Sequence, residues 1–213
     1  MDFIILGAGR HATVTVEYLW RANNCVVGAV GEPSSSWLRT KYPQIPVERS
    51  VGELVSRIGL GDGTVAISAV GDVIAKRDLT NEATREGLSF RSCIHSSAVI
   101  ADSAYIAEGC FIGPGVIVGP HVRIGRHVIL NTSCVIDHDS VVGEMSTICP
   151  SVTICGNVRV GERVFVGTNA TVVENIEIGA FSKVGAMALV NKDIPEYVVS
   201  WGIPSSIQRY VDN

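Results

Sequence analysis

The sequence has little charge and no strongly charged stretch. Charged residues make up 18% of its 213 positions, and the net charge of −4 comes from scattered acids and bases. A surface that binds nucleic acid or an anionic membrane is therefore not expected. This balance favours small molecules and further copies of the chain as partners. With 46% hydrophobic residues, the chain is long enough for one large or two small folded domains.

Long hydrophobic runs are also missing. The apolar stretch at the N-terminus ends at Gly7 and carries Asp2 where a signal peptide has positive charge. No segment reaches the length of a transmembrane helix. We therefore expect a cytoplasmic protein without a membrane span.

The cysteines show none of the spacings that mark a metal site or a redox pair. There is no C-x-x-C pair and no zinc spacing. Without a secretion signal, reduced thiols are expected in place of disulfides. A nucleophilic Cys134 near His138 stays open as an alternative. The six cysteines are Cys25, Cys93, Cys110, Cys134, Cys149 and Cys155.

An aliphatic residue recurs every six positions in the second half of the chain. All sixteen positions are Ile, Leu or Val, and the next residue is Gly at eight of them and Asn or Asp at three more, which suits a chain that bends every six residues. Small or β-branched residues mostly stand two positions earlier, as a narrow interior requires. This period is typical of a hexapeptide-repeat β-helix and fits neither an amphipathic helix nor alternating hairpins. The sixteen are Ile100, Ile106, Ile112, Val118, Ile124, Leu130, Ile136, Val142, Ile148, Ile154, Val160, Val166, Val172, Ile178, Val184 and Val190.

The first 88 residues alternate between strand and helix patterns. Buried strands are predicted in FIILGAG, CVVGAVG and TVAISAV, with helices in RHATVTVEYLWRA, around 51–58 and around 74–86. The segment EPSSSWLRTKYPQIP between them is predicted to be a polar loop. Strands that alternate with helices indicate a small parallel α/β domain, which ends near residues 87–95.

The first strand runs into a glycine turn that fits a phosphate-binding fingerprint. Gly7, Gly9 and Ala12 match G-x-G-x-x-G/A, in which backbone amides and a helix N-terminus receive phosphates. A nicotinamide dinucleotide also needs an acid at the end of the second strand, where this chain has Gly31 followed by Glu32. A nucleotide diphosphate attached to another group explains the same glycines. A tight turn without a ligand is the alternative.

Seven segments, spread over nearly the whole chain, carry a family resemblance. They are GAGRHA (7–12), SAVGD (68–72), IHSSAVIADSAYI (94–106), ILNTSCVIDHDSVVGE (129–144), CGNVRVGERVFVGTNATV (155–172), VGAMALVNKDIP (184–195) and WGIPSS (201–206). Together they resemble the bacterial nucleotide-aminosugar N-acetyltransferases and the sialic-acid O-acetyltransferase-like proteins. The resemblance implies a small Rossmann-like α/β domain at 1–88, a left-handed parallel β-helix of hexapeptide repeats at 93–195, and a C-terminal tail at 196–213. It also implies three hexads per coil and a homotrimer.

The DHD triplet at 137–139 is where the resemblance places the chemistry. It implies that His138 is the general base and that Asp139 orients it. A sugar amine that attacks a thioester must lose a proton, and an imidazole with an ordinary pKa near 6.5 accepts one at neutral pH. A carboxylate on the other ring nitrogen fixes the tautomer and stabilises the imidazolium. Asp137 competes with Asp139 for this position.

One coil of three hexads separates His138 from Gly156, since 138 + 18 = 156. The resemblance implies that the Gly156 amide faces the thioester oxygen, where a donor stabilises the developing oxyanion. A glycine required only by a corner is the competing interpretation. Asn131 stands at the family's asparagine position, where it hydrogen-bonds the acceptor sugar or only turns a corner.

The resemblance further implies acetyl-CoA as the co-substrate and no metal. Acetyl-CoA lies along the coils between subunits in such proteins. Residues expected to contact it are Gly143, Gly167 and Ala186, with Lys183, Lys192 and Arg209 near its phosphates. The residues expected to bind the nucleotide-linked amino sugar are Gly7, Gly9, Arg10, His11, Glu32, Gly71 and Asn131.

Two departures from the family pattern bear on specificity. Thr147 stands where relatives tend to have a second histidine. Gly9-Arg10-His11 replaces Gly-Gly-His, and Gly31-Glu32 replaces an acidic pair.

The resemblance as a whole predicts an N-acetyltransferase for a nucleotide-diphosphate-linked amino sugar, such as a 4-amino-4,6-dideoxy sugar for bacterial polysaccharide synthesis. The nucleotide itself (UDP, dTDP or GDP) stays open.

Three rival functions share this kind of sequence. A γ-class carbonic anhydrase uses the same helix with three zinc-binding histidines, but the spacing of His121, His127 and His138 does not fit that pattern. An O-acetyltransferase for a sugar such as sialic acid would use the same base on a hydroxyl. A non-catalytic trimeric regulator that binds nucleotide sugars is the rival of another class.

Overall fold

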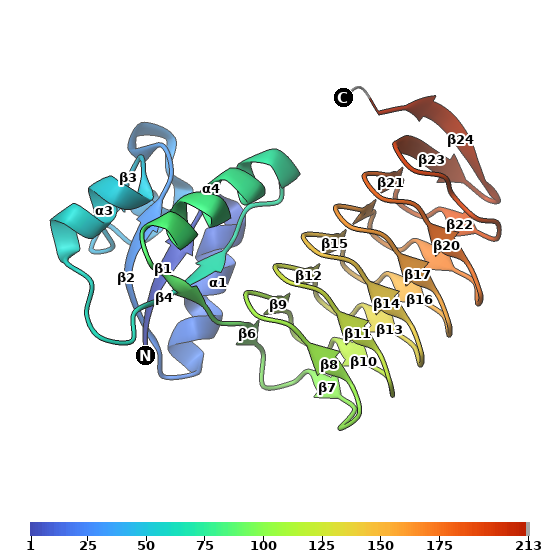
Figure 1. Cartoon of the computed structure of the whole chain (residues 1–213), viewed down its shortest axis with the longest axis horizontal. Helices are drawn as coiled ribbons and strands as arrows, with labels where there is room; N and C mark the ends of the chain where they lie inside the picture. The colour runs from blue at the N-terminus through green and yellow to red at the C-terminus, as the bar shows by residue number, and fades with distance from the viewer. Residues whose placement is uncertain (212–213) are drawn as a thin grey trace. The chain divides into compact units, whose positions relative to one another are not determined.

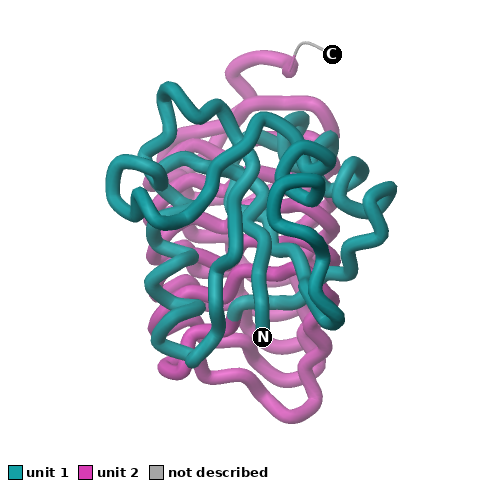
Figure 2. Tube along the Cα trace, turned by 90° about the vertical axis from the view of Figure 1, so that its left-hand side faces the viewer, with its two compact units in different colours: residues 1–93 teal, residues 94–213 magenta. Residues whose placement is uncertain are grey.

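The computed structural model describes residues 1–211 and divides the chain into two compact units, Met1–Cys93 and Ile94–Asn213 (Figure 2). The first unit is an α/β sandwich and the second is a β-helix, as the sequence predicts (Figure 1). Among the described residues, no helix has both the length and the apolar content needed to cross a membrane.

A five-stranded parallel sheet forms the centre of the first unit, in the order β3-β2-β1-β4-β5. Its core consists of aliphatic side chains from both strands and helices, including Ile4, Leu6, Val30 and Leu54. The strands are β1 (Asp2–Leu6), β2 (Cys25–Val30), β3 (Val47–Glu48), β4 (Val65–Ser68) and β5 (Ser89–Phe90). The helices are α1 (Arg10–Arg21), α2 (Trp37–Lys41), α3 (Val51–Ile58) and α4 (Val73–Arg85).

The sequence predicted a polar loop at 32–46, and this prediction is wrong for the central part of the segment. A 3-10 turn, η1 (Pro33–Ser35), and the short helix α2 lie within it. Ser36 caps α2 by accepting a hydrogen bond from the Arg39 amide at 3.0 Å. Only Leu38 of this helix is buried, so the segment lacks the repeated apolar positions from which a helix is predicted.

Three sheets form the faces of the second unit, and their hexapeptide strands pair in parallel between residues 18 positions apart, as in Ile117 and Val135. The first sheet contains β7 (Val99–Ile100), β10 (Ile117–Val118), β13 (Val135–Ile136), β16 (Thr153–Ile154), β19 (Thr171–Val172) and β22 (Leu189–Val190). The second contains β8 (Tyr105–Ile106), β11 (Arg123–Ile124), β14 (Val141–Val142), β17 (Arg159–Val160) and β20 (Glu177–Ile178). The third contains β6 (Cys93–Ile94), β9 (Phe111–Ile112), β12 (Ile129–Leu130), β15 (Thr147–Ile148), β18 (Phe165–Val166), β21 (Lys183–Val184), β23 (Val198–Gly202) and β24 (Ser205–Tyr210).

The interior of the coils is filled by the sixteen aliphatic positions and the small residues before them. Ser140 is one of these small residues, and its buried hydroxyl bridges two coils. It donates to the Cys155 carbonyl at 2.9 Å and accepts from the Val158 amide at 3.0 Å. This bridge fixes the turn after β13 against the turn after β16.

The coil corners use left-handed residues that are mostly not glycine. Asp139, Asn157 and Arg163 have φ values of 59°, 57° and 56°. They stand two positions after the residues that directly follow the aliphatic positions, where the sequence analysis had placed the bends; of those residues only Gly161 is a glycine here. Glycines at such positions instead allow close stacking, because a Cβ on Gly143 would lie 2.5 Å from the Glu162 amide nitrogen of the next coil.

The predicted tail at 196–213 contains regular structure. β23 pairs with β21 in parallel, and β24 returns beside β23 in antiparallel orientation. The third sheet therefore continues to Tyr210.

Candidate active site

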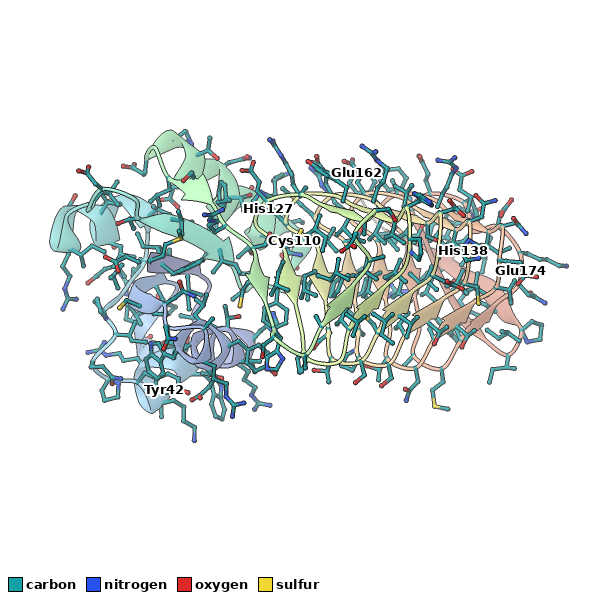
Figure 3. The ribbon with its side chains drawn as sticks, turned by 90° about the horizontal axis from the view of Figure 1, so that it is seen from below. Tyr42, Cys110, His127, His138, Glu162 and Glu174 are labelled. Carbon is teal, nitrogen blue, oxygen red and sulfur yellow. The ribbon has the colours of Figure 1, made fainter. Side chains whose placement is uncertain are left out.

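The turns that follow the strands of the first sheet form one corner of the β-helix, called here the site corner. His138 follows β13 at this corner, and Gly156 follows β16 one coil later. Glu174 and Lys192 occupy the same position on the next two coils, again at intervals of 18 residues. Figure 3 labels His138 and Glu174 in this part of the β-helix.

Asp139 is the carboxylate that contacts the imidazole. The His138 Nδ1 and Asp139 Oδ2 atoms lie 2.8 Å apart. Asp137 instead accepts a hydrogen bond from the His138 backbone amide at 2.7 Å. The two aspartates therefore have different roles: Asp139 orients the ring, and Asp137 holds the backbone of the turn.

Both aspartates favour the protonated imidazole. The pKa of His138 is raised above its ordinary value by the hydrogen bond to Asp139 and, after that, by the charge of Asp137. Because Nδ1 faces Asp139, Nε2 is the atom left to exchange a proton with a substrate. The side chains of His138 and Asp139 are 57% and 55% exposed, so a substrate can reach them.

Gly156 lies directly against the imidazole ring. A Cβ built on it would come 2.6 Å from Cε1 and 2.7 Å from Nε2 of His138. A side chain at position 156 would therefore displace the exposed imidazole ring from its present place.

The amide of Gly156 is also independent of the coil's own hydrogen bonds. Pro114, Pro120 and Pro150 occupy the equivalent hexad position, where they have no N–H to donate. No described residue accepts a hydrogen bond from the Gly156 amide. This N–H is thus a donor beside the imidazole that a substrate oxygen can use.

The thiols near this corner are not activated. Cys134 is completely buried, and burial raises its pKa to about 12. The pKa of Cys155, beside Gly156, is raised by burial first and then by the charges of Glu174 and Asp137. Both thiols stay protonated at neutral pH, which disfavours the alternative of a nucleophilic Cys134.

Asn131 is not brought next to His138 within the chain. It follows β12 and precedes β13, whereas His138 follows β13, so they flank opposite ends of that strand. Its side-chain carbonyl accepts a hydrogen bond from the Thr132 amide at 2.9 Å. Within one chain, Asn131 therefore stabilises its own corner.

The residues predicted to contact acetyl-CoA are distributed over several corners. Gly143 follows β14 of the second sheet, while Gly167 and Ala186 follow β18 and β21 of the third. A Cβ on Gly167 would lie 2.5 Å from the Ala186 amide nitrogen, so coil stacking by itself accounts for glycine there. Lys183 is exposed on β21, and Lys192 is exposed at the site corner.

The predicted nucleotide-binding residues of the first unit gather at the ends of β1 and β4. Gly7 has a φ of 118°, and a Cβ on it would lie 2.7 Å from Cγ2 of Val70. The turn that contains Gly7 and the turn that contains Gly71 therefore touch. A Cβ on Gly9 or Gly71 would have no neighbour within 4 Å, which leaves open space at both.

His11 is held in its neutral form at this end of the sheet. Burial and, after it, the charge of Lys76 on α4 together lower the pKa of His11 to about 4. Lys76 is itself completely buried. A neutral imidazole thus stands on the first turn of α1, beside Arg10.

Glu32 is engaged by its own segment. Its carboxylate accepts a hydrogen bond from the Ser34 hydroxyl at 2.8 Å and lies 3.2 Å from Nε of Arg49. Its first role is therefore to cap η1, for which it also accepts from the Ser34 amide.

Sequence reasoning missed Trp37, which stands at the start of α2. Its ring lies 4.5 Å from the guanidinium carbon of Arg10. The signal in the sequence was an isolated tryptophan in a segment rich in serine and proline. Of the described residues, no three His, Cys, Asp or Glu side chains gather in a way that would hold a metal ion.

Comparisons with known proteins agree with this architecture. Residues 103–138 match the family described as bacterial transferase hexapeptide (six repeats). No curated protein matches the chain. A GDP-perosamine N-acetyltransferase from Caulobacter crescentus, solved with CoA and GDP-perosamine, is 31% identical, with 98% of this chain and 97% of that chain covered and a TM-score of 0.89.

Two further solved structures share the fold. The acetyltransferase domain of PglB from Neisseria gonorrhoeae is 24% identical over 97% of this chain and 99% of that chain, with a TM-score of 0.86. WeeI from Acinetobacter baumannii is 20% identical over 98% and 100%, with a TM-score of 0.87. On the strength of the Caulobacter relative and of the hexapeptide match, this chain belongs to the sugar N-acetyltransferases of the left-handed β-helix, hexapeptide-repeat family.

Proposed function

We propose that this protein is an acetyl-CoA-dependent N-acetyltransferase that acts on an amino sugar carried by a nucleotide diphosphate, with a 4-amino-4,6-dideoxy sugar as the acceptor. The observation that carries the proposal is the arrangement of Asp139, His138 and Gly156 at the site corner. The Caulobacter relative, an N-acetyltransferase that was solved with CoA and GDP-perosamine, supports the donor and the class of acceptor. The cytoplasm, where acetyl-CoA is available, is the proposed compartment.

The proposed reaction is a direct transfer. The amine nitrogen attacks the thioester carbon, and His138 Nε2 removes the proton that the nitrogen loses as the new C–N bond forms. Asp139 stabilises the imidazolium that results. The Gly156 amide donates to the oxyanion of the tetrahedral intermediate. The C–S bond then breaks, and the proton passes from His138 to the departing CoA thiolate.

We also propose a homotrimer built on the first sheet. The residues that alternate with the buried aliphatic positions on this sheet are Val99, Ile117, Val135, Thr153, Thr171 and Leu189. Val99 is 63% exposed and Ile117 is 44% exposed. A flat face of this kind is covered by further copies in many β-rich proteins. The equivalent positions of the second sheet include Arg123, Arg159 and Glu177 and do not suit such a contact.

The proposed trimer explains why predicted site residues are far apart within one chain. Asn131 and His138 flank opposite edges of the first sheet. In a ring of copies that share this face, Asn131 of one copy approaches the site corner of the next. We accordingly place the acceptor sugar near Asn131 and His138, and acetyl-CoA near Gly143, Gly167 and Ala186, with Lys183 and Lys192 toward its phosphates.

The first unit is proposed to hold the nucleotide diphosphate at the Gly7–Gly9 turn, with Arg10, His11 and Gly71 around it. The open space at Gly9 and Gly71 supports this position. Glu32 caps η1 and is assigned an indirect role, in which it shapes the rim of this site.

The first experiment measures thiol release from acetyl-CoA with UDP-, dTDP- and GDP-linked 4-amino sugars, for the wild type and His138→Ala. Turnover with one acceptor that is lost in the variant supports both the reaction and the base. A folded protein that binds CoA and stays silent with every amine, but acetylates a sugar hydroxyl, contradicts the proposal in favour of an O-acetyltransferase. Silence with both kinds of acceptor favours a non-catalytic regulator.

A further inference from the structure

The side chain of Arg10 is a cation without a carboxylate partner. No acidic side chain in residues 1–211 forms an ion pair with it; Arg39 is in the same situation, whereas Arg49, Arg57 and Arg77 are each paired. It lies on the first residue of α1, directly after Gly9. Its guanidinium instead lies over the ring of Trp37, 4.5 Å from the ring centre.

Trp37 is an exposed aromatic residue in a rigid position. The residue is 45% exposed, yet the residues on both sides of it, Ser36 and Leu38, are buried. The Ser36 hydroxyl and the Leu38 amide both donate to the Ala8 carbonyl, each at 3.2 Å. Trp37 is therefore fixed to the glycine turn from which Arg10 emerges.

The far end of α2 is anchored as well. The Tyr42 ring packs edge-on against Trp20 of α1 at 5.0 Å, and its hydroxyl donates to the carboxylate of Glu17. That hydrogen bond, together with burial, raises the pKa of Tyr42 to about 12, so the hydroxyl keeps its proton at physiological pH. Figure 3 labels Tyr42 in this unit. Two contacts thus hold α2 against α1 and keep Trp37 beneath Arg10.

We propose that Trp37 is a positioning residue that holds the Arg10 guanidinium ready to bind the diphosphate of the nucleotide-linked acceptor. A guanidinium presents a planar fork of donors that matches phosphate oxygens, and it stacks on aromatic rings without losing those donors. Because Arg10 is held before the ligand arrives, less side-chain freedom is lost on binding. This inference rests on the proposed function, since it assigns the diphosphate of that substrate.

The assignment also explains why an exposed tryptophan stands in a serine-rich segment. A residue that only filled the core would be buried, as Leu38 is. The alternative role of an exposed tryptophan near a nucleotide is direct stacking on the base. The two roles differ in their dependence on Arg10 and on the number of phosphates, and the test separates them.

The test measures the affinity of the full-length protein for GDP, UDP and dTDP and for the matching monophosphates by calorimetry. Arg10→Ala is expected to lower the affinity for the tightest-binding diphosphate about 10- to 150-fold, the loss typical of a hydrogen-bonded charge. The ratio of the diphosphate affinity to the monophosphate affinity is expected to fall as well. Trp37→Ala is expected to lower the affinity for this diphosphate about 2- to 5-fold, and Trp37→Phe is expected to keep most of the wild-type affinity. Arg39→Ala, which removes a cation two residues from Trp37, is the matched control and is expected to change nothing.

The double variant decides between positioning and stacking. If Trp37 acts through Arg10, Trp37→Ala causes no further loss of affinity in the Arg10→Ala background. In the transfer assay, both single variants then raise KM for the acceptor and leave kcat and KM for acetyl-CoA unchanged. Additive losses, or equal losses for diphosphate and monophosphate, overturn the proposal in favour of base stacking.

The outcome is distinguishable from failure of the proposed function. A protein that binds a nucleoside diphosphate through Arg10 but transfers no acetyl group would contradict the enzyme assignment and leave this inference standing. If the protein acetylates a nucleotide-linked amino sugar and Arg10→Ala binds the nucleoside diphosphate as tightly as the wild type, the enzyme assignment stands and this inference is overturned. Failure of the wild type to bind any of the three diphosphates also overturns the inference.

Discussion

Gly156 and His138 lie so close on adjacent coils that a Cβ at position 156 would come 2.7 Å from the imidazole Nε2, and the ring would have to move. The Gly156 backbone and the imidazole nitrogen therefore lie next to each other, and no described residue accepts a hydrogen bond from the Gly156 amide. A thioester carbonyl that reached this amide and an amine that reached Nε2 would find an oxyanion donor and a base together.

Gly156→Ala is expected to lower kcat about 100-fold or more, because the added methyl group displaces the ring and blocks access to the amide. Steady-state rates with saturating acetyl-CoA test this. Glu162→Ala is the matched control, since Glu162 has the same hexad position at another corner (Figure 3). Similar rates in the two variants would argue against the oxyanion role.

Asp139→Asn is expected to change both the maximum rate and its pH dependence. With His138 as the proposed base, the rate needs its neutral form, so wild-type activity is expected to fall as pH drops through a pKa that lies above the ordinary 6.5. Removing the carboxylate lowers that pKa, which moves the acidic limb to lower pH. The plateau is expected to fall on the order of 100-fold, because the ring loses its orientation. A pH profile of kcat/KM gives both quantities.

Asp137→Asn separates charge from orientation. Asparagine can still accept the 2.7 Å hydrogen bond from the His138 amide, but it carries no charge. The acidic limb is therefore expected to move to lower pH, with a plateau close to that of the wild type. A plateau as low as that of Asp139→Asn would show that Asp137 takes part in the orientation of the base.

Stability is expected to fall in mild acid because of His11. Its pKa is about 4 in the folded protein and near 6.5 when unfolded, so the unfolded state binds more protons between these values. The contribution is fully present above pH 6.5 and is lost as pH falls toward 4, by about 3 kcal/mol in total. Denaturant unfolding of the first unit at several pH values measures it. His11→Gln should flatten this part of the profile.

Gly143→Ala tests whether the corner glycines serve coil stacking. The new Cβ would lie 2.5 Å from the backbone of the next coil, and a loss of about 1–3 kcal/mol of unfolding free energy is expected. Glu162→Ala should leave the urea midpoint unchanged. If Gly143→Ala weakened only CoA binding and left stability intact, the glycine would be a ligand contact and not a packing requirement.

A charge on the first sheet is expected to break the proposed trimer. Ile117→Glu places a carboxylate on the aliphatic face, where desolvation makes association unfavourable. Sedimentation velocity should then report smaller species, together with loss of activity if each site is shared between copies. Arg159→Glu on the second sheet is the control, and it should sediment like the wild type.

The sequence by itself determined the architecture of both units and the pairing of His138 with Gly156. The hexad repeats without interruption, and the family resemblance supplies three hexads per coil, so the neighbour of a corner residue follows by adding 18 to its number. In the first unit, the alternation of buried strands with amphipathic segments was equally direct, and α3 and α4 lie where the pattern predicts them.

Only the tertiary structure decided the details that depend on side-chain direction and on non-local contacts. Asp137 and Asp139 are equivalent in the sequence, and the left-handed turn at Asp139 brings its carboxylate to the ring. The sequence also did not show why glycine stands at these corners, because the atoms that a Cβ would meet belong to the backbone of the next coil. The sequence did not predict α2, because tertiary contacts and not a periodic apolar pattern hold this helix. For the same reason it did not predict that Trp37 lies beside Arg10.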